Sequence, residues 1–464
     1  MKKSIKTLLA VFFLLLFASF VFSKLSKPKT INHSPHIYYD NKLNGKDSVP
    51  LLVLTTYFNN RTSITAQEIR NKIISGEIKC TKDVTDRLKK IFKLSRDPES
   101  IFINNCSKTS DSLIFITGID SVNVNYLSME VDSIDFFKTP NKYPLWVKNE
   151  NNSTFNFSKQ ITSYVHTGVT ALTRSTGSLL DRISLDKYIY NILPYFKNPD
   201  LVHISNEVSF SDSVDYSTMK MSFASKLRDF EILKKLNVSL VELTGNHNLD
   251  FGSKAYLNTL KWYRDNKIDY FGGGKNKHEA SSPLIRILED GTKIAWIGFN
   301  ELCPCGECTD RTKLGIGANR FNKDSASKII NRLKYIEHVD YIISCVQFGE
   351  RDSYQPSESQ KKICRELIDF GSDVIIGSQA HQAQEIAIYK GKLIFYGTGN
   401  FMFDQIHRIG VRQAFFLECY FYKGKIIQFK PVYTFMQLNR IPNVATYDEA
   451  SVIKKAILRK SNFQ

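Results

Sequence analysis

The stretch VSLVELTGNHNLDFGSKAYLNTLKWYRDNKI, residues 238–268, decides the fold class and raises the question of function. It begins with an apolar run, passes through a polar loop and continues into a segment whose apolar residues have helical spacing. Asn246 and His247 follow the apolar run directly. An amide and an imidazole at a strand end are expected where a ligand needs both groups. The loop is therefore either a metal-centred hydrolytic site or a polar turn.

The same order of strand, polar loop and helix repeats from residue 161 onward. Near-continuous apolar runs bounded by helices predict strands that are buried on both faces of an α/β sheet. The expected strands are ITSYVHTGVTAL, DLVHISNE, SLVELTGNH, KIAWIGFNE, VDYIISCVQFGE, SDVIIGSQAH and KLIFYGTGNFMF, and the expected helices include SLDKYIYNILPYF, MSFASKLRDFEILKKLNV and SKAYLNTLKWYRDNKI.

Polar side chains stand at or just past the end of most of these strands. Ligand sites in α/β sheets assemble at the carboxyl ends of the strands. A single polar cluster indicates a turn, whereas several in register indicate a shared site, so the pattern favours a site. The residues are Asn206 and Glu207, Asn246 and His247, Asn300 and Glu301, Gln347 and Glu350, Gln379 and His381, and Asn400.

The chemistry of these side chains is that of oxygen and nitrogen metal ligands. Carboxylate, amide and imidazole groups suit Mn, Zn, Fe or Mg better than Cu(I) or iron–sulfur clusters. Such ions polarise a phosphoryl or acyl group and generate hydroxide near neutral pH, and a histidine that is not bound to metal can protonate a leaving group. The sequence has no serine nucleophile elbow, no phosphate-binding Gly-Lys-Ser/Thr loop and no dinucleotide fingerprint.

Length and charge set wider bounds. A chain of 464 residues with 42% hydrophobic content is long enough for about two or three domains. The net charge of +17 favours contact with anionic surfaces or polymers, although a composition rich in Asn, Lys and Ile explains it equally well. No zinc-finger spacing, aromatic-basic RNA motif or long basic arm is present, so nucleic acid is not an expected partner.

The N-terminus has the layout of an export signal. Lys2, Lys3 and Lys6 precede an apolar run from residue 8 to residue 22, which is at the short end for spanning a bilayer. Residues 1–23 are predicted to be a signal peptide or an uncleaved signal anchor, which would associate the chain with the membrane. Because basic residues stay inside, the rest of the chain is expected to be extracytoplasmic, in the cell envelope or periplasm.

Two further segments precede the repeated strands. Residues 24–48 are polar and predict a tether, and residues 49–148 alternate short strands with helices, which predicts a smaller accessory α/β domain. Ser63 is the expected N-cap of the first helix of this domain. SITAQEIRNKIISGEI and NKYPLWVK faintly resemble the phosphate-binding type of periplasmic solute-binding protein, so the domain is either one degenerate lobe of that kind or a plain accessory domain. Residues 141–160 are expected to be a polar linker.

The cysteines allow two interpretations. CPCGEC, residues 303–308, is either a disulfide loop or a set of thiolate ligands. An exported chain favours the disulfide, and no nearby residue completes a zinc tetrad. Cys345 and Cys419 lie in apolar runs and are expected to be small core residues.

A series of motifs follows in order between residues 160 and 436: HTGVTALTR, HISNE, LTGNHNLDFG, YFGGG, VQFGERDSYQPSESQ, GSDVIIGSQAHQAQ and IFYGTGNFMFDQ. In order and spacing they resemble the CapA-type capsule synthesis proteins, which are poly-γ-glutamate biosynthesis proteins and a branch of the calcineurin-like metallophosphoesterases. The resemblance implies a four-layer α/β sandwich with a dinuclear metal centre at the strand ends. It also implies an extracytoplasmic role in making, cutting or anchoring an anionic capsule polymer. Residues 437–464 are expected to form a C-terminal tail.

The sequence departs from the family at three ligand positions. The first strand of the family typically ends Gly-Asp, with the Asp a metal ligand, and Val169 stands there instead. The family's His before Trp-Gly or Phe-Gly is Gln347, and its Gly-x-His-Pro-His loop is GSQAH, which contains Gln379 and His381. Since an amide oxygen is a neutral and weak ligand, these replacements argue against a full two-metal site. The alternatives are two divalent ions, a single weakly held ion, or a metal-free binding cleft.

These comparisons give the candidate site. The alternatives are that Glu207 caps the next helix, that His247 fixes its loop by hydrogen bonds, and that Glu350 belongs to a solvated charge run. His166 and His203, upstream on their strands, either compensate for lost ligands or are simply buried. The expected metal ligands are Glu207, Asn246 and His381, the catalytic residue is His247, the altered-ligand positions are Val169, Gln347 and Gln379, and the substrate-binding residues are Asn206, Glu350 and Asn400.

Two classes of function follow from this site. The first is a metal-dependent hydrolase or transferase that acts on an anionic polysaccharide or a polyglutamate-like polymer. The second is a non-catalytic polymer-binding or scaffold protein on the same fold, because a fold does not determine an activity.

Overall fold

The computed structural model describes residues 48–92, 94–100, 110–148, 155–304 and 306–463. The predicted signal segment and nearly all of the tether lie outside these ranges. Within them, no helix combines the length and the apolar character needed to cross a membrane.

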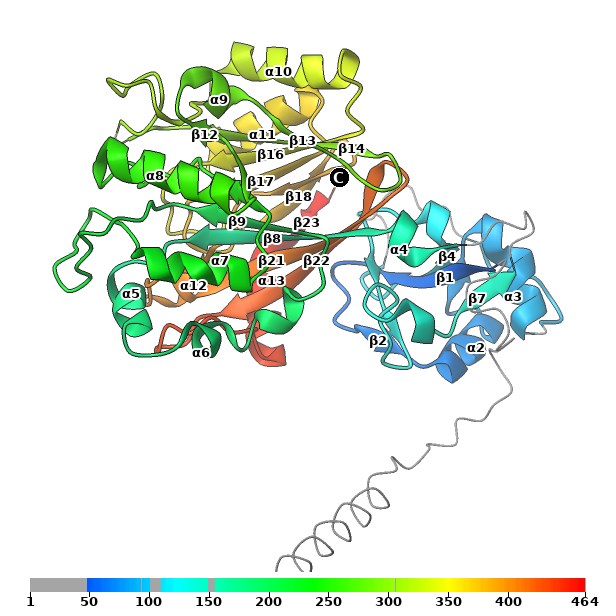
Figure 1. The fold of residues 1–464 in the computed structure, drawn as a ribbon. Coiled ribbons are helices and arrows are strands. Elements are labelled where there is room, and N and C mark those ends of the chain that lie inside the picture. Colours follow the sequence, from blue (N-terminus) through cyan, green and yellow to red (C-terminus); the bar gives the residue numbers. More distant parts are fainter. Residues whose placement is uncertain (1–47, 93, 101–109, 149–154, 305, 464) are drawn as a thin grey trace, which may run out of the picture. The chain divides into compact units, whose positions relative to one another are not determined.

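Two mixed sheets form the centre of residues 155–463 (Figure 1). In the first, the β8 sheet, strands β8, β9, β10 and β11 are parallel and β21 returns antiparallel to β8. In the second, the β16 sheet, strands β14, β16, β17 and β19 are parallel. The β8 sheet has the order β11 (Asp269–Phe271), β10 (Leu240–Glu242), β9 (Leu201–Asn206), β8 (Thr162–Thr170), β21 (Gln413–Tyr422) and β22 (Lys425–Phe435), with β20 (Asn400–Met402) beside β8. The β16 sheet has the order β13 (Leu284–Ile287), β14 (Lys293–Asn300), β16 (Tyr341–Gln347), β17 (Val374–Ser378), β19 (Lys392–Phe395), β18 (Ile386–Tyr389) and β23 (Leu458–Phe463).

The two sheets share one apolar core. Trp296 of β14, Ile343 of β16 and Phe395 of β19 pack in the same buried cluster as Tyr164 of β8 and Phe415 of β21. Strands buried on both faces need nearly continuous apolar sequence, and every residue of β16 is indeed buried.

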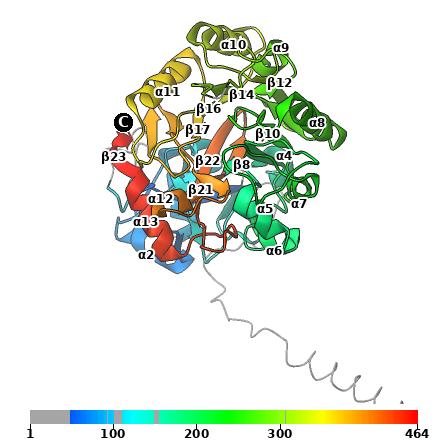
Figure 2. The ribbon, with the colours of Figure 1, turned by 90° about the vertical axis from the view of Figure 1, so that its left-hand side faces the viewer.

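Helices cover the outer faces of both sheets (Figure 2). One outer core joins α6, α7 and α8 to the β8 sheet, and another joins α10 and α11 to the β16 sheet. The described residues therefore form a mixed α/β protein, as predicted, with the layer order helices, sheet, sheet, helices. The helices of this part are α4 (Phe157–Gln160), α5 (Arg174–Leu180), α6 (Leu185–Ile189), α7 (Glu231–Lys235), α8 (Gly252–Asp265), α9 (Lys277–Ser281), α10 (Lys323–Tyr335), α11 (Glu358–Phe370), α12 (Ile409–Arg412) and α13 (Tyr447–Ile457).

The helix predicted over residues 221–238 is confirmed only in part, because its first six residues are not helical. Only a short 3-10 turn, Leu227–Phe230, and α7 are helical there. Before them Ser225 exchanges backbone hydrogen bonds with Ser209 and Ser211. This long-range pairing overrides the local helical pattern.

Residues 48–148 contribute a smaller sheet, whose strand order is β3-β4-β1-β5 with β7 beside β1. The predicted N-cap at Ser63 is wrong, because Ser63 pairs with Glu130 in a short parallel ladder and Thr65 caps the helix instead. Within the expected polar linker, residues 146–148 form a strand. The elements are β1 (Ser48–Thr55), β2 (Ser63–Ile64), α2 (Ala66–Ile74), β3 (Lys79–Cys80), α3 (Thr85–Phe92), β4 (Ile114–Gly118), β5 (Leu127–Ser128), β6 (Glu130–Val131) and β7 (Trp146–Lys148).

The smaller sheet is joined to β21 and β22 by polar and aromatic contacts. The Tyr57 hydroxyl donates to the Phe429 carbonyl at 3.1 Å, and the Ser128 N–H donates to the Gln428 side chain at 2.9 Å. Phe137 stacks on Tyr420 with ring centroids 4.2 Å apart. The described residues accordingly belong to one compact unit.

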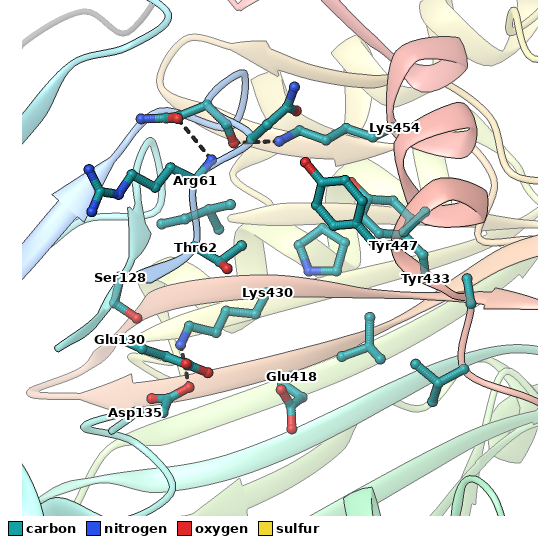
Figure 3. Close-up of a pocket in the computed structure, with 18 of the residues that line it drawn as sticks. Arg61, Thr62, Ser128, Glu130, Asp135, Glu418, Lys430, Tyr433, Tyr447 and Lys454 are labelled. Carbon is teal, nitrogen blue, oxygen red and sulfur yellow. Dashed lines mark hydrogen bonds and ion pairs between the residues drawn. The ribbon is translucent and has the colours of Figure 1, made fainter. Parts of the chain in front are cut away.

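A cleft of about 400 Å³ lies at this junction (Figure 3). Lys430 and Asp135 form an ion pair of 2.7 Å on its wall, and Lys454 donates to the Asn59 carbonyl at 2.6 Å. Burial lowers the pKa of Lys454 to about 8. In both contacts a lysine from the C-terminal part of the chain binds a residue of the 48–148 region.

The C-terminal residues beyond 436 are integrated into the fold. Helix α13 begins with a capping box in which Thr446 and Glu449 satisfy each other's backbone N–H groups. Strand β23 then pairs in parallel with β18 at the edge of the β16 sheet.

The Lys430–Asp135 pair allows a first prediction. Both side chains are nearly buried, so replacing Asp135 by Leu leaves an uncompensated charge and should destabilise the protein by about 3–5 kcal/mol in urea unfolding. The double variant D135L/K430M should recover most of this loss. Equal losses in the single and double variants would contradict the argument.

The same pair sets a pH dependence. Burial raises the pKa of Asp135, but Lys430 outweighs it and the net pKa is lowered. A lowered folded-state pKa stabilises the fold above the pKa of the unfolded carboxyl group, and this stabilisation is lost as the pH falls through the folded-state value. The stability difference between the wild type and D135L/K430M should therefore shrink in acid.

Candidate metal centre

The ends of strands from both sheets meet in one polar cluster. Asn246 follows β10 of the β8 sheet, and Gln347 ends β16 of the other sheet. The Gln347 Nε2 donates to Asn246 Oδ1 at 2.9 Å and to Gln379 Oε1 at 2.6 Å. These three amides therefore bridge the two sheets, and all three are buried.

Glu207 is the carboxylate of the cluster. It is fully buried, and neither of its carboxylate oxygens has a hydrogen-bond partner among the residues that the structure describes. Burial raises the pKa of Glu207, although the charges of His381 and His247 oppose that effect. Gly245 permits the close approach of the GNH loop, because a Cβ there would lie 2.7 Å from the Glu207 Cα. A buried carboxylate without donors needs either a proton or a cation.

His381 is oriented by two neighbours. Its Nδ1 lies 2.9 Å from the Asn400 Oδ1, and its Nε2 lies 3.6 Å from Glu350. Because an amide oxygen accepts, Nδ1 carries a proton, so the neutral form of the ring has its lone pair on Nε2. Burial lowers the pKa of His381, but Glu350, Glu207 and Asn400 outweigh it and the net pKa is raised. The ring thus presents Nε2 as a possible ligand atom.

His247 forms a dyad with Asp250. Its Nδ1 lies 2.7 Å from Asp250 Oδ2, and its Nε2 lies 3.3 Å from the Asn246 amide nitrogen. The ring also packs on Phe223, with centroids 4.0 Å apart. A histidine held by a carboxylate on one nitrogen can take or give a proton at the other.

Sequence reasoning missed three residues beside this dyad. Asp250 orients His247, and it lies in the quoted LTGNHNLDFG motif, where its spacing of three residues was the available signal. Arg174 pairs with Asp404 and lies over the Phe223 ring at 4.4 Å. No local pattern joins Arg174 to Asp404, because 230 positions separate them.

Two residues expected to contact substrate are occupied elsewhere. The Asn206 amide donates to the Val208 carbonyl and the Tyr263 hydroxyl, so it fastens α8 to the sheet instead of facing a ligand. Asn400 accepts from His381 and donates to the Val411 carbonyl, which makes it a positioning residue. These contacts give both amides a structural role, and their expected role as substrate-binding residues stays a prediction.

Val169 lies at the level of the cluster but supplies no ligand atom from its side chain. It is fully buried and pairs with Ser205 of β9 on one side and Asn400 of β20 on the other. Gly168 beside it is packed against Gly399, where a Cβ would come within 2.1 Å of the carbonyl oxygen. The register therefore places an apolar side chain where the family resemblance implies a carboxylate.

These donors fit a cation only in part. The orphaned Glu207 oxygens and the Nε2 of His381 are suitable ligand atoms, and the Asn246 oxygen retains a second lone pair. Gln347 and Gln379 are neutral and hydrogen-bonded to each other. The donor set fits one divalent cation better than two.

The CPCGEC loop forms a disulfide. Cys303 and Cys308 are bonded, which confirms the prediction and leaves neither sulfur as a thiolate ligand. Cys345 and Cys419 are free and fully buried, as expected of core residues. The position of Cys305 lies outside the described residues.

Known proteins resemble this chain over the region that contains the cluster. The family described as "Bacterial capsule synthesis protein PGA_cap" matches residues 158–405. The capsule biosynthesis protein CapA of Bacillus anthracis is 27% identical over 238 residues, which cover 50% of this chain and 57% of the relative. The PGA biosynthesis protein CapA of Bacillus subtilis (strain 168) is 23% identical over 251 residues, which cover 54% and 65%. The chain thus spans less than two thirds of the length of these curated relatives.

Among solved structures, TT1561 of Thermus thermophilus aligns with a TM-score of 0.30 and 12% identity, covering 56% of this chain and 94% of that one. The family match carries the assignment, because it covers more than half of the chain and contains Glu207, Asn246, Gln347 and His381. The chain belongs to the bacterial capsule synthesis protein family PGA_cap, as its motif string predicted.

Proposed function

We propose that this protein acts outside the cytoplasmic membrane in making, cutting or anchoring an anionic capsule polymer of the poly-γ-glutamate type. Its family and the names of its Bacillus relatives support the link to capsule synthesis. A net charge of +17 favours association with a polyanion. The strand-end cluster between the two sheets is the proposed working site.

The Glu207 carboxylate is the observation that carries this proposal. It is fully buried, has no hydrogen-bond donor among the described residues, and interacts electrostatically with His381 and His247. A structural glutamate at this depth would be expected to accept hydrogen bonds. Its position instead suits a cation held between Glu207, Asn246 and His381.

The residues of the cluster would then have the following roles. Asn400 holds the proton of His381 on Nδ1, so that Nε2 remains a donor atom. Asp250 orients His247, whose Nε2 would give a proton to the leaving group. A divalent cation bound at this site, Mn, Zn, Fe or Mg, would polarise the carbonyl or phosphoryl group of the substrate. Reaction classes that match are hydrolysis and transfer.

One observation favours the second candidate, a polymer-binding protein without catalysis. Asn246, Gln347 and Gln379 satisfy one another through two hydrogen bonds. Such a network satisfies buried amide groups without a metal ion, so the cluster can be stable in the metal-free protein. Metal content separates the two candidates.

The second prediction tests the ion. The full-length protein should bind about one Mn, Fe or Zn ion at the strand-end cluster, and E207Q and H381A should each abolish that binding, as measured by elemental analysis after dialysis. H278A is the matched control, because His278 is exposed on α9. An unchanged metal content in E207Q and H381A would leave the binding protein as the better candidate.

The third prediction concerns the positioning residue. In N400L the His381 ring loses its Nδ1 partner, so the affinity for the ion should fall by about 10–100-fold while the fold is retained. Titration calorimetry with Mn²⁺ measures the affinity, and circular dichroism checks the fold. Equal affinities in N400L and the wild type would show that Asn400 does not orient His381.

The fourth prediction restores the family's ligands. The triple variant V169D/Q347H/Q379H replaces three neutral side chains by a carboxylate and two imidazoles, so it should bind a second ion and bind the first more tightly. The readouts are the metal stoichiometry and the shortening of poly-γ-glutamate chains by size-exclusion chromatography. If the triple variant folds and gains no metal, the strand ends do not form the family's two-ion geometry.

A further inference from the structure

A second group of ligand-type side chains lies between the two sheets, apart from the strand-end cluster. His166 of β8, His203 of β9 and Cys345 of β16 each offer a ligand atom, and these atoms all lie within 4.8 Å of one another. All three side chains are buried, with 2%, 0% and 0% exposure. Residues from three strands and both sheets therefore converge inside the core.

The register explains the convergence. His166 pairs with His203 across β8 and β9, and their rings stack with centroids 3.9 Å apart. Cys345 precedes Gln347 by two residues, and alternate residues of a strand point to the same face. The group thus lies one step deeper in the sandwich than the strand-end cluster.

His203 stacks on His166, but its ring nitrogens are unsatisfied. Neither ring nitrogen has a hydrogen-bond partner within the part of the chain that the structure describes. An imidazole always carries at least one donor or acceptor that must be satisfied when it is buried. A metal ion would satisfy one nitrogen directly.

The His166 ring is hydrogen-bonded at Nδ1. Its Nδ1 lies 2.7 Å from the Tyr164 hydroxyl, which accepts a hydrogen bond from the Trp296 indole at 3.1 Å. When Nδ1 donates this hydrogen bond to the Tyr164 oxygen, the ring is fixed and Nε2 is left for a ligand.

Glu242 completes the charge balance. One of its oxygens lies 3.7 Å from the His203 Nε2, and the other accepts a hydrogen bond from Thr244. A divalent cation together with the Cys345 thiolate and this carboxylate would be neutral overall. Neutrality matters here because an uncompensated charge in the core is costly.

We propose that His166, His203 and Cys345 bind a zinc ion inside the sandwich, with Glu242 at its edge as the balancing carboxylate. Two imidazoles and a thiolate suit Zn²⁺ better than Mg²⁺ or Ca²⁺. With bonds of about 2.0–2.3 Å, tetrahedral ligand atoms lie about 3.3–3.8 Å apart, so the side chains must shift by about 1 Å to close the site. The stacked His166 and His203 rings must also turn, because the lone pair of an imidazole lies in its ring plane. The ion ties β8, β9 and β16 together and is structural, since no ligand faces solvent.

Cobalt substitution of the full-length protein tests this proposal. After unfolding, chelation and refolding with Co²⁺, the wild type should show a thiolate-to-cobalt charge-transfer band, which only a cysteine ligand produces. C345S should lose the band and one equivalent of metal, and E242Q should weaken metal binding about 10–100-fold. C364S is the matched control, because Cys364 is equally buried on α11 but packs in the outer core.

The two metal sites are distinguished by crossed variants. E207Q and H381A should keep the charge-transfer band even if they lose a strand-end ion, so failure of the proposed function leaves this result intact. Absence of the band in the wild type, or its persistence in C345S, overturns the proposal. The wild-type spectrum decides the question even if C345S does not fold.

Discussion

Tyr164 and Trp296 meet edge to face between the two sheets, with ring centroids 5.7 Å apart and a hydrogen bond from the indole to the phenol oxygen. Such a pair adds about 0.5–1.5 kcal/mol beyond the burial of its area. Its larger effect is geometric, because it belongs to the core that holds the β8 sheet against the β16 sheet. With the sheets in this position, loops after strands of both sheets meet, and Asn246 can accept a hydrogen bond from Gln347. The polar cluster is thus a consequence of apolar packing beneath it.

The strands could be predicted from sequence because buried strands require nearly continuous apolar runs, and the polar residues after each run marked where a strand ends. Elements governed by long-range pairing could not be predicted this way. Ser63 has the chemistry of an N-cap, but its pairing with Glu130 makes it part of a strand. Residues 221–226 belong to a segment with helical spacing, but Ser225 pairs with residues before it in sequence. Local propensity decides a segment only where no distant partner competes for its backbone.

The residues of the candidate site also differ in how far the sequence could predict them. Residue type alone singled out Glu207 and His381 as candidates, because a carboxylate and an imidazole at strand ends can both serve as metal ligands. Residue type could not separate Asn206, whose amide is directed to Tyr263, from Asn246, whose amide oxygen joins the cluster. Nor could it reveal that Asn400 serves His381. These roles depend on which way each amide points, and that is determined by neighbours far away in the sequence.

The register of β8 and β9 shows what lies beside the positions that depart from the family pattern. Val169 and Gln347 are neutral where the family resemblance implies ligands, yet His166 and Cys345 lie upstream on the same two strands. An irregularity in β8 between His166 and Val169 lets them align with His203 and Ser205 of β9, which are only two residues apart. Both His166 and Cys345 therefore share a face with the position that lost its ligand and lie one step deeper. His166 and Cys345 are thus ligand-type side chains on these same strands, but they are buried between the sheets. An ion bound there would stabilise the packing of the sheets and would not contact a substrate.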